Sequence, residues 1–164
     1  GYQDDGTGKL VLSPAGLTGT NFGLISFYTK PVFNGSLNLS LTTRNGFQFA
    51  SGQSFRLMSF PAATNWVSCL NGLDLENGIL FQPQFTATTL SLVATAYNVS
   101  ATKPQLFLGN TFGGVSVIWP DKFSAWTLQS ATNLTSTLWT TVSACSDNAL
   151  VPNAGQKQFF RLKQ

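Results

Sequence analysis

Hydrophobic and polar residues alternate along short stretches of this chain in the pattern of β-strands. In the stretch 36–42, Ser-Leu-Asn-Leu-Ser-Leu-Thr, three leucines share one face and polar residues share the other. The same period of two recurs, in places more loosely, at 54–60, 89–94, 115–119, 126–129 and 159–162. Because each stretch has the length of one strand and is bounded by Gly, Asn or Pro, the pattern predicts a succession of short strands.

Asn-Gly pairs mark the expected turns between these strands. One pair, 45–46, follows the leucine-rich stretch, and the pairs 71–72 and 77–78 flank a short Leu-Asp-Leu run. Asn-Gly favours the tight turns that join antiparallel strands. No hydrophobic period of 3.6 residues with helix caps is present, so we expect no helix. The sequence therefore predicts an all-β fold with the architecture of an antiparallel β-sandwich.

The chain divides most naturally at 98–104, Asn-Val-Ser-Ala-Thr-Lys-Pro, a polar segment that contains proline. We therefore expect two β-modules that pack together, the first over residues 1–98 and a smaller one over 99–164. The opening, Gly-Tyr-Gln-Asp-Asp-Gly, is typical of a cut inside a longer polypeptide. No basic-then-apolar signal segment opens the chain, so we expect its export signal to lie upstream. We expect this chain to be one module of a larger protein.

The two cysteines, Cys69 and Cys145, fall in different expected modules. A disulfide between them would close a long loop and stabilise the folded chain by about 4 kcal/mol in the chain-entropy model. The alternative is two separate thiols, each buried as a small apolar group. Charged residues make up only 9% of the chain, which is common among exported β-proteins. We expect a secreted, extracellular protein with this pair bonded across the modules.

The composition argues against catalysis, nucleic-acid binding and membrane insertion. The chain has no histidine and six acidic residues, while general acid–base and metal chemistry depend on such groups, so we expect no enzyme and no cofactor. The net charge of +3 reflects few acids rather than a dense basic stripe, so we expect no nucleic-acid partner. No stretch approaches the ~20 continuous apolar residues of a membrane span.

The second module carries a recognisable set of motifs. They are Val-Ile-Trp-Pro (117–120), Ala-Trp-Thr-Leu-Gln-Ser-Ala-Thr-Asn-Leu (125–134), Leu-Trp-Thr-Thr-Val (138–142) and Gln-Phe-Phe-Arg-Leu-Lys (158–163). Over residues 105–163 the chain resembles carboxyl-terminal segments of large exported bacterial proteins and a shortened fibronectin type III-like sandwich. The resemblance implies that Trp119 and Trp126 lie in a core and that the setting is bacterial and exported.

The first module is more loosely similar to terminal pieces that follow repetitive β-structure in exported bacterial proteins. The matching features are Gly-Ser-Leu-Asn-Leu (35–39), Gly-Phe (46–47), Gly-Gln-Ser-Phe (52–55) and the Asn-Gly turn at 71–72. Secreted polysaccharide-degrading enzymes carry similar β-sandwiches as carbohydrate-binding modules. The resemblance therefore keeps carbohydrate binding open as a function.

Exposed aromatic residues would provide the platform for such a ligand. Sugar rings stack their apolar faces on aromatic side chains, while nearby polar groups supply hydrogen bonds. Trp66, in a loop-like stretch beside Asn65, is the first candidate, and Trp139 is the second. Asp74 is a further polar candidate for the same site. The alternative for both tryptophans is a place in the core, where large aromatic residues are usually found.

Asp74 and Glu76 would point to the same side of a strand, because they lie two residues apart. Together with backbone carbonyls and Asn71 or Asn77, they are a candidate calcium site. The alternative is two solvated carboxylates beside a turn, since calcium requires six or more oxygen ligands.

We expect a non-catalytic accessory module of a secreted bacterial protein that binds polysaccharide through exposed aromatic residues. The alternative is a structural or anchoring terminal domain of a large surface protein, with no small ligand. A solvent-facing strip of aromatic residues would favour binding, and a polar surface without one would favour the structural role.

Overall fold

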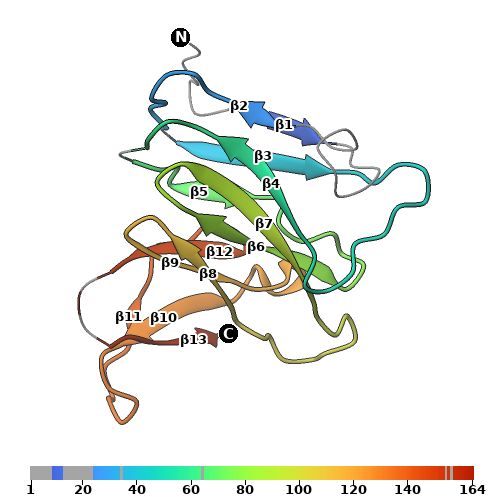
Figure 1. Ribbon diagram of the computed structural model, residues 1–164. Coiled ribbons are helices and arrows are strands. Elements are labelled where there is room, and N and C mark those ends of the chain that lie inside the picture. Colours follow the sequence, from blue (N-terminus) through green and yellow to red (C-terminus); the bar gives the residue numbers. More distant parts are fainter. Residues whose placement is uncertain (1–8, 13–23, 34, 64, 154, 156) are drawn as a thin grey trace.

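The computed structural model describes residues 9–12, 24–33, 35–63, 65–153, 155 and 157–164, and it consists almost wholly of β-strands (Figure 1). Strands account for 44% of the chain. Within these residues the one helical element is the short 3-10 helix η1 (Asp121–Phe123). No helix in the described part of the chain is long and apolar enough to cross a membrane. The predicted all-β fold is confirmed.

The first five strands alternate between two sheets. One sheet has the order β1-β3-β5 and consists of β1 (Lys9–Leu12), β3 (Ser36–Leu41) and β5 (Cys69–Asn71). The other has the order β2-β4-β7-β6 and consists of β2 (Ile25–Ser26), β4 (Ser54–Ser59), β7 (Thr89–Ala96) and β6 (Ile79–Phe85). From β1 to β6 the chain thus passes from one sheet to the other with each strand, as in a coil.

Strands that are neighbours in these sheets run parallel from β1 to β5. β1 pairs with β3, β3 with β5 and β2 with β4, all in parallel. Parallel neighbours need a long connection, and here the passage through the opposite sheet provides it. The antiparallel pairing that the sequence predicts therefore occurs only from β4–β7 and β6–β7 onward. We refer to β1–β7 as the coil.

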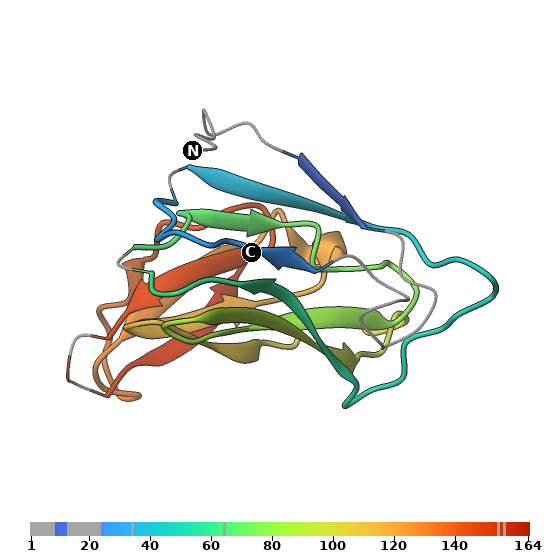
Figure 2. The ribbon, with the colours of Figure 1, turned by 45° about the horizontal axis from the view of Figure 1, so that its top comes forward.

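The rest of the chain forms two antiparallel three-stranded sheets. The order β12-β9-β8 joins β8 (Phe107–Thr111), β9 (Gly114–Ile118) and β12 (Asn148–Pro152). The order β11-β10-β13 joins β10 (Thr127–Ala131), β11 (Thr140–Thr141) and β13 (Phe159–Lys163). Figure 1 shows the β12-β9-β8 sheet between the coil and the last sheet, and Figure 2 turns the molecule so that its β1 and β2 end comes forward.

Two hydrophobic cores lie on opposite sides of the β12-β9-β8 sheet. The first contains side chains of both coil sheets together with Phe107 and Ile118. The second contains Val117, Trp119 and Leu128, among others. Because adjacent residues of a strand point to opposite faces, Val117 and Ile118 serve different cores. The boundary expected at 98/99 therefore separates the two cores only in part, since β9 contributes to both and β8 contributes Phe107 to the first.

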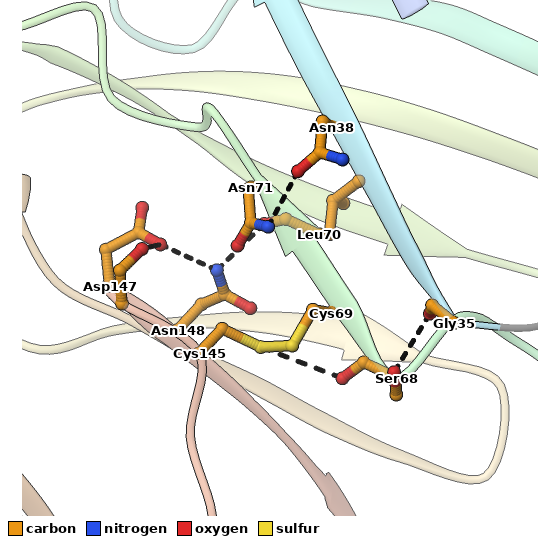
Figure 3. Close-up of a disulfide and its surroundings, with 10 residues drawn as sticks. Gly35, Asn38, Ser68, Cys69, Leu70, Asn71, Cys145, Asp147 and Asn148 are labelled. Atoms are coloured by element: carbon orange, nitrogen blue, oxygen red, sulfur yellow. Dashed lines mark hydrogen bonds between the residues drawn. A yellow bond between two sulfur atoms is a disulfide. The ribbon is translucent and has the colours of Figure 1, made fainter. Parts of the chain in front are cut away.

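The disulfide between Cys69 and Cys145 is present and joins the two expected modules (Figure 3). The two residues are 76 positions apart in sequence, and their Cα atoms lie 5.9 Å apart. The bridge connects β5, the last parallel strand of its sheet, to the segment that leads into β12. The predicted pairing is confirmed.

Candidate functional site

The two ends of the coil differ in what lies beside their last strands. At the end formed by β5 and β6, strands of the β12-β9-β8 sheet lie against the coil: β12 beside β5, and β8 beside β6. We call this the closed end. At the other end, formed by β1 and β2, no described strand pairs with the outer edge of either strand. We call this the open end.

A buried asparagine closes the edge of β5. Asn148 is 0% exposed, and its Nδ2 donates to the backbone carbonyl of Leu70 at 2.8 Å and to Asp147 Oδ1 at 2.8 Å (Figure 3). The side chain thus takes the place of the N–H group that a further strand would offer to β5. Next to it, the disulfide fixes β5 to the same segment of the chain.

The edge of β6 is closed by a proline and a glycine. Pro83 lies within β6, where it offers no N–H group to a further strand. Gly109 of β8 packs directly on it: a Cβ atom added at Gly109 would lie 2.5 Å from the Pro83 carbonyl oxygen, so only glycine fits. Asn110 Nδ2 also donates to Gln84 Oε1 at 3.3 Å. These contacts leave no room for a strand beside β6.

Within the coil, like residues stack on one another from strand to strand. Leu37 of β3 pairs with Leu70 of β5, and Asn38 pairs with Asn71. Asn71 Nδ2 donates to Asn38 Oδ1 at 2.8 Å, which is the contact of an asparagine ladder (Figure 3). Such stacking of equivalent positions is typical of β-structures that repeat along one axis.

A pocket of about 400 Å³ opens where the coil meets η1, lined in part by Asp74, Tyr97, Asp121 and Lys122. The Asp74 carboxylate accepts hydrogen bonds from three donors there. Tyr97 Oη lies 2.8 Å from Oδ1 and 3.0 Å from Oδ2, the Glu76 N–H donates to Oδ1 at 2.8 Å, and the Asp121 N–H donates to Oδ2 at 3.0 Å. Burial, with the hydrogen bond to Asp74 second, raises the pKa of Tyr97 above its usual value. Asp74 therefore connects the coil to η1.

Asp121 of the pocket lining lies beside a second carboxyl group, that of Asp147. Asp147 is 1% exposed, and no N–H group or hydroxyl of the described residues donates to its Oδ2. Burial raises the pKa of Asp121 to about 7, with a hydrogen bond to Asp147, the charge of Asp147 and the charge of Asp74 as further causes. A proton on Asp121 supplies the donor that Asp147 Oδ2 otherwise lacks, which reconciles these two observations.

The nearby cation does not neutralise this pair. Lys122 donates through Nζ to the carbonyl oxygens of Val99 and Ala101, the latter at 2.7 Å. It therefore fastens the segment after β7 to η1. Glu76, the remaining acidic residue of the pocket lining, is exposed. The raised pKa of Asp121 accords with its place beside the Asp147 carboxylate, which has no cation of the described residues to balance it.

Trp66, the first aromatic candidate, is packed among other rings. Its ring centroid lies 4.3 Å from that of Phe33 and 4.1 Å from that of Phe85, and it belongs to the periphery of the first core. Asn65 is bonded twice to the backbone of Phe33: its Nδ2 donates to the carbonyl at 2.6 Å, and its Oδ1 accepts from the N–H at 3.3 Å. Both side chains therefore fasten the segment before β5 to Phe33.

Trp139 lies in a more open setting, beside the last sheet. Its ring is half-buried, its Nε1 donates to the Ser136 carbonyl at 3.0 Å, and the Arg161 guanidinium lies 4.2 Å from the ring centroid. Arg161 Nε in turn donates to Gln129 Oε1 at 3.0 Å. We call Trp139, Arg161 and Gln129 the Trp139 face.

The other predicted polar residues do not join Trp139 or Trp66. The Asp74 carboxylate accepts hydrogen bonds from Tyr97, Glu76 and Asp121, and the calcium site expected there together with Glu76 stays a prediction. In the parts of the chain that the structure describes, no group of three or more cysteine, aspartate or glutamate side chains could hold a metal ion.

The residues that close the coil were missed by the sequence analysis. Pro83 gave a usable signal, because a proline inside a strand pattern indicates an edge strand. Asn148 gave none, since its partner Leu70 lies 78 positions away in the chain. The same holds for Asp121 and Asp147, which no local motif connects.

Comparison of the chain with protein-family models, with curated proteins and with solved structures finds no match. The resemblances drawn from the sequence motifs therefore stay predictions, and the function has to be argued from the geometry.

Proposed function

We propose that this chain is a structural terminal module of a secreted bacterial protein, which ends a stack of parallel β-coils and binds no small ligand in that role. The observation that carries the proposal is the asymmetry of the coil. Its β5–β6 end is closed by Asn148, the disulfide, Pro83 and Gly109. Its β1–β2 end has no comparable contact among the described residues.

The physics of edge strands supports this function. The last strand of a sheet presents unpaired N–H and C=O groups that recruit other strands, and proteins suppress this with prolines, covering segments or side chains. Stacked repeats need a terminal unit that closes the core and satisfies the last edge. The β12-β9-β8 sheet does both, because it places Phe107 and Ile118 in the coil core and Asn148 at the edge.

Amide hydrogen exchange tests the proposal in the intact chain. We expect the amides of β5 and β6 to exchange about tenfold or more slowly than outer-edge amides of β1 and β2. The Asn148→Ala variant should selectively speed up exchange in β5, whereas the control Asn110→Ala, at an exposed position of β8, should not. Equal exchange at both ends of the parent chain would contradict a terminal role for the β12-β9-β8 sheet.

The Trp139 face favours a second candidate function, polysaccharide binding. Arg161 and Gln129 lie beside a half-buried tryptophan on an open sheet, and Leu138 next to it is 82% exposed. The Arg161 guanidinium lies over one face of the Trp139 ring and is held by the Gln129 amide, so a sugar ring would stack on the other face. This candidate replaces the platform expected at Trp66, since that ring packs against Phe33 and Phe85.

Affinity electrophoresis against a panel of soluble plant and microbial polysaccharides tests this second candidate, with and without calcium. We expect any retardation to be lost in Trp139→Ala and kept in Tyr28→Ala, whose aromatic ring is 95% exposed elsewhere. If no polymer retards the parent chain, the structural role alone remains.

A further inference from the structure

We propose that the outer edges of β1 and β2 bind the preceding coil of the same polypeptide, one strand in parallel beside β1 and the next beside β2. This inference rests on the proposed terminal role and names the partner of the open end. Figure 1 shows β1 and β2 at the same end of the molecule, away from the β12-β9-β8 sheet.

The direction of the stack identifies the occupant as chain that precedes β1. In the order β1-β3-β5, each strand lies beside the strand of the next coil, and β2-β4 repeats this order in the other sheet. The neighbour on the outer side of β1 is therefore the strand one coil earlier. At the other end no coil can follow, because Asn148 and Pro83 close the edges there.

The register gives the length of the coil. Asn38 of β3 pairs with Asn71 of β5, and the two lie 33 positions apart in the chain. In the second sheet Ser26 pairs with Ser59, again 33 positions apart. The step from β1 to β3 is slightly shorter, since Lys9 pairs with Asn38. A preceding coil should therefore contribute roughly 30 residues, a spacing within the range of repeat proteins.

The register also indicates which residue types the strand beside β1 should carry. Leu10 is in register with Leu39, and Leu12 with Leu41, so the strand beside β1 should carry apolar residues opposite these two positions. Lys9 is in register with Asn38 and, through it, with Asn71. Because like charges directly opposite one another are destabilising, the position opposite Lys9 should carry asparagine or an acidic residue rather than a further lysine.

A second copy of this chain fits the open end less well. Two copies related by a two-fold axis present the same edge to each other, and β1 would then meet its counterpart in antiparallel orientation. Every described neighbour within β1-β3-β5 is parallel. A preceding coil continues that parallel pattern in both sheets at once.

A tandem duplication of residues 9–37 tests the proposal, because it repeats the observed step from Lys9 of β1 to its partner Asn38 in β3. The added copy carries Lys9→Asn, so that no lysine lies opposite Lys9. We expect a folded monomer in which the outer-edge amides of the original β1 and β2 gain about tenfold or more protection from hydrogen exchange. The matched control duplicates residues 10–37. Its insert lacks one residue, which reverses the faces of the added strand, so it should give no protection.

A second duplication variant is needed in case the first one does not fold. Duplicating residues 36–68 adds one coil inside the stack at the spacing that separates β3 from β5. The proposal is overturned if neither in-phase duplication folds, or if the first folds and leaves the β1 and β2 amides at the parent rate. It is also overturned if the parent chain dimerises with those amides protected, since the occupant would then be a second copy. Exchange in β5 and β6 reports separately on the closed end.

Discussion

The closed end and the open end of the coil are built from the same kind of strand but are finished in different ways. At the closed end a fully buried asparagine donates to Leu70, a disulfide fixes β5, and Gly109 packs on Pro83. At the open end, Ile25 of β2 packs on the edge of the first core, and Ser26 makes a surface hydrogen bond to Ser59. An edge that ends a stack thus needs buried polar partners, whereas an edge that continues one does not.

We expect the largest effect from removing the disulfide at the closed end. Replacing both cysteines, Cys69→Ala with Cys145→Ala, should lower the free energy of unfolding by about 4 kcal/mol, because the bridge restricts a long loop of the unfolded chain. Urea denaturation measures this difference. The parent chain under reducing conditions is the control and should lose a similar amount. A loss below about 1 kcal/mol would show that the other contacts hold β5 without the bridge.

We expect the second-largest effect from removing the buried amide of Asn148 at the closed end. Asn148→Ala should cost about 3 kcal/mol, because the buried carbonyl of Leu70 and Oδ1 of Asp147 both lose this donor. The exposed Asn110, whose amide bonds to Gln84 on the surface, is the matched control, and Asn110→Ala should change stability by less than about 0.5 kcal/mol. Equal losses in the two variants would refute the role given to Asn148.

The pH dependence of stability tests the carboxyl pair Asp121 and Asp147 near the closed end. The pKa of Asp121 is raised to about 7, so the folded chain holds this proton more tightly than the unfolded chain does. Its contribution to stability is therefore largest below pH ~4, falls as the pH rises, and is lost above pH ~7. After discounting for partial exposure and coupling, we expect a loss of about 2 kcal/mol across that range.

Thermal unfolding of the parent chain and of Asp121→Asn between pH 5 and pH 8 measures this effect. The asparagine amide donates to Asp147 at every pH, so the variant should lose less stability than the parent as the pH rises. Parallel pH profiles for the two proteins would mean that Asp121 and Asp147 do not share a proton.

The individual strands were predictable from sequence because their signals are local. The leucine alternation at 36–42 corresponds to β3, and the stretches 54–60 and 89–94 correspond to β4 and β7. The Asn-Gly pair at 45–46 takes positive φ values of 54° and 71°, as a tight turn with left-handed residues requires. Period and turn chemistry are properties of a few neighbouring residues, so they can be seen without the fold.

Strand partners and the candidate site were not predictable, because they depend on residues far apart in the chain. An alternating strand pairs equally well in either direction, and the parallel order of β1-β3-β5 follows only from the passage through the second sheet. The sequence around Trp66 indicates a loop, and only the fold brings Phe33 and Phe85 against its ring. The disulfide was predictable because only two cysteines exist to pair.

The smallest expected effect lies at the open end. Ser26→Ala removes the hydroxyl that contacts Ser59 Oγ at 3.1 Å on the surface, and the free energy of unfolding should change by less than about 0.5 kcal/mol. Asn148→Ala is the counterpart at the closed end, and urea denaturation of both variants under one set of conditions gives the contrast directly. A loss at Ser26 as large as that at Asn148 would mean that the edge of β2 is already buried in this chain. Both ends of the coil would then have buried edges, and their difference would no longer indicate in which direction the stack continues.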